Sequence, residues 1–359
     1  MSQLQYTRKN MEIFRGKSYS DVIIDAYKLL LHEGNTVAPR QKETKELENV
    51  LLVIEDPTDR VPLFKHRNAN IFALLAETIW TFAGRDDLDF IHNYLERLAQ
   101  FSENKIVVAG AYGPRMRQWD KGADLFFVYN SLCDGDRIDQ LYNVYNILKN
   151  DPYSRRAVIS IYNPKYDYNN ERWDIPCVNW LQFRIRNNKL NLSVVSRSMD
   201  AVWGSSVNVF EWTTLLEIMA MWLNVEIGQY THYIGSFHMY DYHFERAKKM
   251  VDNYESRHLA AKLSVDISRE FFDEELKIFF KKEEYSRKTG MQDNKYTLKS
   301  SWLKYVDTLF AAFNNWNKFK DIQATEKILA QLESSDLLDA ARDYLMRQEI
   351  KLVKGNWKK

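Results

Sequence analysis

The chain has 359 residues, of which 45% are hydrophobic and 14% aromatic, enough for one large core or for a core domain with an appendage. Its 50 Lys and Arg residues nearly cancel its 49 Asp and Glu residues. This balance excludes a global field that would draw the protein to nucleic acid or to an anionic membrane, so any anion must be bound locally. Two cysteines, Cys133 and Cys177, are too few for a disulfide framework or a cysteine-rich zinc site, and we expect two free thiols and no metal. The N-terminus lacks the apolar run of a signal peptide and no stretch of transmembrane length is free of charge, so we expect a cytoplasmic protein.

Apolar residues at helical spacing predict several helices in the first 150 residues. The first covers 19–32, with a stop at Gly34. The others are expected at 69–82 with Asn68 as the cap, at 87–100 and at 136–149, and a short apolar run at 50–54 indicates a buried strand.

Between 157 and 198 the apolar period changes to two, which is typical of strands. Asn187-Asn188 separates two alternating runs and predicts a hairpin, so these strands should form one mostly antiparallel sheet. The almost wholly apolar segment 210–223 suits a helix packed deep against that sheet, and 225–239 is extended in character.

The last third of the chain is helical and charged, with segments at 269–282, 300–319 and 326–346. Acidic residues are interleaved with its basic and aromatic ones, which favours core helices with solvated lysines over a nucleic-acid surface. We therefore expect a catalytic domain over 1–250 and a helical extension over 251–359.

Pro176-Cys177 is the most informative pair in the sequence. It stands before an alternating strand and about twenty residues upstream of Arg197-Ser198-Met199-Asp200, so nearby arginines would favour the thiolate and could anchor a phosphate. We interpret Cys177 as a nucleophile and Cys133 as a small core residue.

Several separate motifs occur in the order and spacing of one family. They are 151–156, Pro176-Cys177, Arg197 to Asp200 with Gly204 and Asn208, and His238-Met239-Tyr240, supported by Arg40, Glu77 to Trp80, and Tyr112. Over residues 20 to 250 the chain resembles the thymidylate synthase superfamily, including its pyrimidine-nucleotide hydroxymethylase branch. The resemblance implies an α+β fold with a mostly antiparallel or mixed sheet against long helices, working as a homodimer.

The resemblance also assigns roles to individual residues. Cys177 would add to C6 of a pyrimidine so that C5 can attack methylenetetrahydrofolate. Arg40, Arg197 and Ser198 would hold the nucleotide phosphate, with Arg155 and Arg156 reaching in from the partner subunit. Asn208 would form hydrogen bonds with uracil. Alternatively, its side chain could only cap a helix that begins at residue 209. The remaining assignments are Asp200 for the ring oxygen, His238 and Tyr240 for the sugar, Glu77 for proton relay, Tyr112 for loss of the C5 proton, and Trp80 and Gly204 for the folate.

Three departures from the family pattern bear on the product. Val178 replaces a histidine, so its part of the water network is missing or is rebuilt by Asn179, and Ser196 replaces a glutamine. The tryptophans that cover the folate appear as Leu98 and Phe101. Because hydride transfer needs the pterin in close, dry contact, losing these walls favours attack by water. The chain also ends in a long helical extension in which we see no lid of the usual kind.

These observations predict transfer of a hydroxymethyl group from methylenetetrahydrofolate to C5 of dUMP. The alternatives are a thymidylate synthase that makes dTMP, a hydroxymethylase acting on dCMP or CMP, and a regulator that binds a nucleotide without chemistry. No nucleic-acid or membrane partner is expected, and the cytoplasm would be that of a host cell if the chain is viral.

Overall fold

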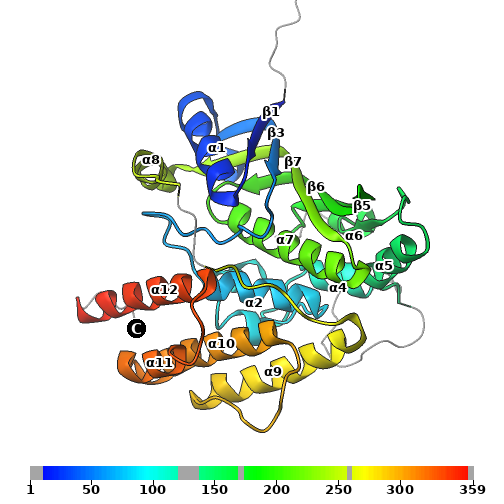
Figure 1. The fold of residues 1–359 in the computed structure, drawn as a ribbon. Coiled ribbons are helices and arrows are strands. Elements are labelled where there is room, and N and C mark those ends of the chain that lie inside the picture. Colours follow the sequence, from blue (N-terminus) through cyan, green and yellow to red (C-terminus); the bar gives the residue numbers. More distant parts are fainter. Residues whose placement is uncertain (1–10, 120–136, 169–173, 257–260, 355–359) are drawn as a thin grey trace, which may run out of the picture.

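The computed structural model describes residues 11–119, 137–168, 174–256 and 261–354. A seven-stranded mixed sheet runs in the order β1-β3-β7-β6-β5-β4, with β2 paired to β3 (Figure 1). Four pairings are antiparallel, β2 with β3, β3 with β7, β4 with β5 and β5 with β6, and two are parallel, β1 with β3 and β6 with β7. The strands are β1 (Glu12–Gly16), β2 (Asn35–Val37), β3 (Thr44–Ile54), β4 (Val158–Ser160), β5 (Val178–Arg186), β6 (Lys189–Asp200) and β7 (Glu226–Tyr240).

The predicted hairpin between β5 and β6 is confirmed. Asn187 and Asn188 have φ angles of 51° and 58°, the left-handed conformation that a two-residue turn needs and that asparagine tolerates. The hairpin sets the register as far as the pair of Trp180 and Val195, and an irregularity between Trp180 and Val178 then shifts it so that Val178 pairs with Ser196.

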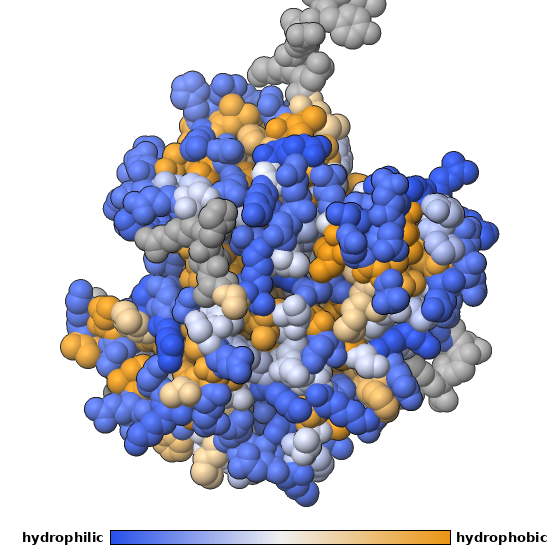
Figure 2. Space-filling view, in the orientation of Figure 1, coloured by the Kyte–Doolittle hydropathy of each residue, from blue (hydrophilic) through white to orange (hydrophobic). Residues whose placement is uncertain are grey.

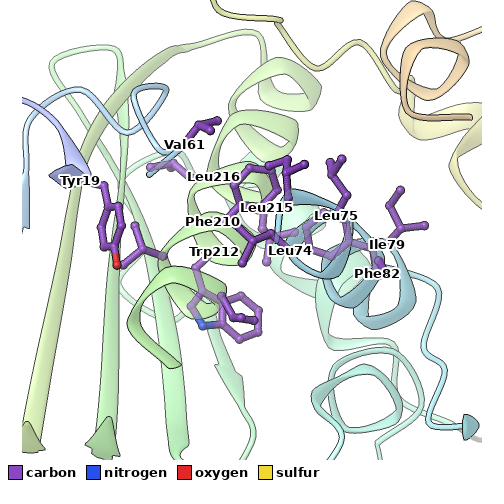
Figure 3. Packing of buried hydrophobic residues seen from close by; sticks show 14 of the residues in the cluster. Tyr19, Val61, Leu74, Leu75, Ile79, Phe82, Phe210, Trp212, Leu215 and Leu216 are labelled. Atoms are coloured by element: carbon purple, nitrogen blue, oxygen red, sulfur yellow. The ribbon is translucent and has the colours of Figure 1, made fainter. Parts of the chain in front are cut away.

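The α7 helix (Gly204–Leu223) is the central helix that the apolar segment predicted, and it begins six residues earlier than expected. Asn208 therefore lies inside the helix, and its alternative role as an N-cap is wrong. Helix α2 (Ile71–Phe82) packs on α7 through Leu74, Leu75 and Ile79, opposite Phe210 and Leu215 (Figure 3). In Figure 1, α7 lies between the sheet and α2.

The other early helices follow the sequence with some corrections. Ser18 forms a capping box with Asp21 at the start of α1, and Gly34 ends that helix as predicted. Asn70, not Asn68, caps α2. The predicted helix over 87–100 is wrong, because Asp87 caps only one helical turn before the chain bends into a 3-10 segment. The bounds are α1 (Tyr19–Glu33), η1 (Pro39–Gln41), α3 (Leu88–Ile91), η2 (Glu96–Phe101), α4 (Tyr112–Arg117), α5 (Gln140–Asn150) and α6 (Pro164–Asp167).

In Figure 1, α9, α10 and α11 lie below α2 and α12 lies to its left, and these helices share its buried cluster. Phe72 of α2 contacts the rings of Phe313 and Tyr344, at centroid distances of 4.7 and 5.4 Å. The segment predicted as one helix over 326–346 is two helices with a break between them. The division at residue 250 stays a prediction. The elements are η3 (Asp241–His243), α8 (Phe244–Asp252), η4 (Arg269–Phe271), α9 (Phe272–Thr289), α10 (Ser301–Phe319), α11 (Ile322–Leu329) and α12 (Asp336–Val353).

The helices can be compared with the length and hydropathy that a membrane span requires. Within the described ranges, none of the helices is both long enough and apolar enough to cross a bilayer. In the view of Figure 2, hydrophobic residues form separate patches between hydrophilic ones.

Candidate active site

The sheet places Cys177 beside the Arg-Ser pair that follows it twenty residues later. Cys177 stands immediately before β5, and its carbonyl accepts a hydrogen bond from the amide of Arg197 on β6 at 2.9 Å. The thiol is partly exposed. This strand pairing turns the two sequence motifs into one site.

Two side chains of β6 contact the sulfur directly. The Ser198 hydroxyl lies 3.6 Å and the Arg197 Nη2 atom 3.8 Å from Cys177 Sγ. The same guanidinium donates to the carbonyls of Pro176 and Ile175, each at 2.9 Å. Arg197 thus supplies positive charge to the thiol and also holds the segment that carries it.

A small pocket of about 90 Å³ lies on the inner side of Cys177 and is called the Cys177 pocket. Glu77 and Thr81 reach it from α2, Leu98 from η2 and Tyr112 from α4. The full lining consists of Glu77, Trp80, Thr81, Leu98, Val108, Gly110, Ala111, Tyr112, Asp174, Ile175, Pro176 and Cys177. The structure therefore gathers the predicted nucleophile with both predicted proton-handling residues.

The pocket shifts the ionisation of its acidic groups. Burial raises the pKa of Glu77 to about 7, against a lowering influence of Arg97. Burial also raises the pKa of Tyr112 well above its usual value, and the charges of Cys177 and Glu77 act in the same direction. A glutamate that titrates near neutrality can accept and return a proton, whereas Tyr112 stays a neutral hydroxyl. Glu77 is partly buried and lines the Cys177 pocket.

Asp174 is a pocket residue that sequence reasoning missed. Its Oδ2 atom accepts a hydrogen bond from the Gly110 amide at 3.0 Å, and burial raises the pKa of its carboxyl group. A Cβ atom on Gly110 would lie only 2.5 Å from that oxygen, so a side chain there would force Asp174 to move. The sequence feature that could have indicated Asp174 is its position three residues before Cys177.

The residues predicted to hold the base and the sugar lie around the ends of β6 and β7. Asp200 pairs in register with His238, and its carboxylate accepts from the amides of Val202 and Trp203 at 2.7 and 2.9 Å, which shapes the turn into α7. His238 and Tyr240 are partly buried and contact each other edge to face at 5.5 Å. Gly204 is the first residue of α7, and Asn208, one turn later, is 6% exposed.

The predicted phosphate and network residues are more scattered. The backbone of Arg40 belongs to η1, but its side chain lies outside the described set. Arg155 and Arg156 are exposed in the turn before β4, and neither lines the Cys177 pocket. Asn179 lines a different surface pocket with Trp180 and Gln182. Cys133 lies outside the described residues.

The predicted folate-facing residues differ in their positions. Trp80 is 2% exposed and donates its indole N–H to the Asp87 carbonyl at 3.0 Å, while it lines the Cys177 pocket. Leu98 is a partly buried wall of the same pocket. Phe101 is 37% exposed and is not part of that lining. Of the two residues that stand where the family pattern has tryptophan, Leu98 and not Phe101 lines the pocket beside Cys177.

A second, larger pocket of about 780 Å³ lies where η2, the start of α2, α8 and α12 meet, and is called the arginine pocket. Arg67, Arg97, Arg246 and Arg347 line it together with Trp203. The guanidinium carbons of Arg97, Arg246 and Arg67 lie 4.5, 5.4 and 5.7 Å from the Trp203 ring centroid. Arg67 is 2% exposed, and its Nε and Nη1 atoms have no hydrogen-bond partner among the described residues. Such a concentration of cations is suited to an anionic ligand.

Metal ligands do not gather in the described ranges, where no group of three or more His, Cys, Asp and Glu residues could hold an ion. The groups around Cys177 are instead the guanidinium of Arg197, the carboxyl group of Glu77 with a pKa of about 7, and the neutral hydroxyl of Tyr112.

Comparison with known proteins identifies the class. The sequence profile of the thymidylate synthase family matches residues 19–294, most of the chain, and the chain belongs to this family. The match extends past residue 250 into α9.

The chain is similar to several phage proteins named deoxyuridylate hydroxymethyltransferase. That of Bacillus phage SP01 is 39% identical over 232 residues, which cover 64% of this chain and 59% of the relative. Those of Pseudomonas phage M6 and Delftia phage PhiW-14 are each 30% identical and are covered over 54% and 52% of their lengths. The chain therefore spans a little over half the length of these relatives.

Proposed function

We propose that the protein is a deoxyuridylate hydroxymethyltransferase, which converts dUMP, methylenetetrahydrofolate and water to 5-hydroxymethyl-dUMP and tetrahydrofolate. The observation that carries this proposal is the position of Cys177, between the Arg197-Ser198 pair and a pocket that contains Glu77 and Tyr112. The names of the phage relatives support the same activity.

The chemistry uses the thiol as a reversible nucleophile. The Cys177 thiolate adds to C6 of uracil, so that electron density reaches C5 and C5 forms a bond to the one-carbon unit of the donor. Tetrahydrofolate leaves, and the C5 proton departs beside Tyr112 and passes through water to a base, for which Glu77 with its pKa near neutrality is suited. Water then adds to the exocyclic methylene, and the sulfur–carbon bond breaks to regenerate the thiolate.

The nucleotide is recognised by groups around β6, β7 and α7. Arg197 and Ser198 hold the phosphate with Arg40, and His238 and Tyr240 bond the sugar hydroxyl. Asn208 presents one donor and one acceptor to O4 and N3–H of uracil, and the main-chain amide of Asp200 contacts O2. A carboxylate at position 208 would instead suit cytosine, so dUMP is preferred over dCMP.

Folate enzymes of this family use methylenetetrahydrofolate as the donor, and the two pockets supply complementary surfaces for it. The pterin end would lie near Leu98, Trp80 and Gly204, and the carboxylates of the glutamate tail would pair with the arginine pocket. Leu98 leaves a less confining wall than an aromatic side chain. Water therefore reaches the methylene before a hydride does.

A homodimer would complete the site. Alternate residues of β5, β6 and β7 are only partly buried, which leaves one face of the sheet without full cover in the single chain. Trp180 and Val158 are 36% and 38% exposed on this part of the sheet. Packing of two such faces would bury them and could bring Arg155 and Arg156 to the partner's nucleotide.

Release of tritium from C5-labelled dUMP tests this function against a binding protein without chemistry. The enzyme is expected to release tritium in the presence of the donor, and Cys177→Ser is expected to abolish the release. Cys133→Ser, which changes the other cysteine, should keep it. Tight dUMP binding with no release in the unmodified protein would favour a cytoplasmic nucleotide-binding regulator instead.

A further inference from the structure

A second carboxyl group is buried close to Glu77. Glu211 lies on α7, is 0% exposed, and has no hydrogen-bond partner for either carboxyl oxygen among the described residues. A buried polar group is normally hydrogen-bonded, and an unpartnered carboxylate in the interior would be strongly destabilising. Glu211 therefore needs a proton, a partner, or both.

Glu211 is not part of the lining of the Cys177 pocket, but helix geometry relates it to Asn208. It lies three residues after Asn208 on α7, so both side chains lie on one side of that helix. On α2, Glu77 and Thr81 are four residues apart and both line the Cys177 pocket. Thr81 is 1% exposed, and its hydroxyl oxygen also lacks a hydrogen-bond partner among the described residues. The unpartnered polar atoms of the two packed helices thus face a common region.

The ionisable groups around Glu211 agree with this placement. Burial raises the pKa of Glu211 well above its usual value, and the charge of Glu77 raises it further, while the Thr81 hydroxyl, which lies close to the carboxyl group without forming a hydrogen bond of ordinary geometry, lowers it. Burial raises the pKa values of Tyr112 on α4 and Tyr230 on β7 well above normal, and the charge of Glu211 acts on both in the same direction. Among the described residues, no positively charged group lowers the pKa of Glu211. When one carboxyl of the pair ionises, Glu77 does so and Glu211 keeps its proton.

We propose that Glu211 is a positioning residue for Glu77: its protonated carboxyl donates a hydrogen bond to the ionised Glu77 carboxylate, directly or through one water molecule that Thr81 also contacts. The bond would stabilise and orient the base form of Glu77 without placing a cation in the pocket. This inference rests on the proposed function in one respect, that Glu77 acts as the base.

Two variants separate this role from simple packing. Glu211→Gln keeps the shape and a donor group, whereas Glu211→Met fills a similar volume with no donor. Glu211→Met is expected to move the acidic limb of the pH profile of tritium release upward by about one pH unit, because a hydrogen bond to a charged group has that order of strength. Glu211→Gln should leave the limb within a few tenths of a unit. If the acidic limb of the pH profile in both variants lies at the same pH as in the unmodified protein, the proposal is overturned.

An infrared measurement decides the question without enzyme activity. The C=O stretch of a buried protonated carboxyl should persist at about pH 9, where Glu77 has lost its proton, in the unmodified protein and in Glu77→Gln, and should be absent there in Glu211→Gln. A band that Glu211→Gln leaves unchanged would contradict the proposal, even if Glu211→Met fails to fold. Failure of tritium release in the unmodified protein would instead refute the proposed function and leave the infrared result to stand alone.

Discussion

The hydroxyl group of Ser198 lies 3.6 Å from the sulfur of Cys177, although twenty residues separate them in the sequence. Adjacent strands produce this proximity, since Val178 pairs with Ser196 and the Arg197 amide bonds to the Cys177 carbonyl. The proposed nucleophile and its proposed anion-binding neighbours therefore lie on adjacent strands of the sheet, while the proposed acid-base residues, Glu77 and Tyr112, come from helices.

Replacement of Arg197 by lysine should slow the reaction of Cys177 with iodoacetamide. One guanidinium reaches the Pro176 carbonyl, the Ile175 carbonyl and Cys177 Sγ together, which a single ammonium group cannot do. We expect roughly a tenfold lower alkylation rate, from the loss of about one charge-assisted hydrogen bond. Arg186→Lys, at an exposed position of β5, is the control. Equal rates in the two variants would remove Arg197 from thiol activation.

Glu77→Gln should change both activity and stability with pH. Because the pKa of Glu77 is raised to about 7, tritium release should rise as pH increases through that value and should be largely lost in the variant. The unfolded chain loses this proton near its ordinary pKa of 4.5, so the folded state becomes less stable as pH rises from there to about 7.

Glu77→Gln has no carboxyl group to ionise, so its folded state does not lose stability in this way as pH rises. It should therefore be more stable than the unmodified protein above pH 7, by an upper bound of roughly 3 kcal/mol, and should show no such gain near pH 4. Urea unfolding at the two pH values measures the difference, with the exposed Glu48→Gln as control. A gain that is the same at both pH values would show that the pKa of Glu77 is not raised.

Leu98→Trp should shift the product from hydroxymethyl toward methyl, or slow the attack of water. An indole at this position would narrow the wall of the Cys177 pocket and exclude solvent from the methylene. Phe101→Trp changes an exposed ring outside that lining and should leave the product ratio unchanged. Mass spectrometry of the nucleotide products measures the ratio, and identical ratios in both variants would mean that Leu98 does not control the outcome.

Mixed dimers test whether Arg156 acts across the subunit boundary. Cys177→Ser and Arg156→Ala are each expected to be nearly inactive alone. Random mixed dimers would contain one intact site in half of the molecules, so co-refolding should restore about a quarter of the normal activity. If mixing restores nothing while each variant still dimerises, the arginine works within its own subunit or not at all.

The strands and central helix could be predicted because their signals are local. Alternation defined β5 and β6, and two asparagines able to adopt positive φ marked the turn between them. The helix expected over 87–100 failed for a tertiary reason. Leu88 and Val108 donate backbone hydrogen bonds to Ile106 and Asp86, so this segment folds back on itself instead of continuing as a helix.

The residues of the site also fall into those that the sequence could predict and those that it could not. Motif spacing led to Cys177, Arg197 and Glu77, whose roles repeat across a family. Glu211 and Arg67 were missed because periodicity does not reveal which charged residues become buried or what they face. The signal for Glu211 was a carboxyl group at the start of the apolar run in α7, one turn after Asn208.

The most direct test is an incubation of the protein with methylenetetrahydrofolate and equal amounts of dUMP and dCMP in isotopically labelled water, read by mass spectrometry. We expect 5-hydroxymethyl-dUMP that carries solvent oxygen, little change in dCMP, and folate recovered as tetrahydrofolate. Unlabelled dTMP with an equal amount of dihydrofolate would contradict this expectation.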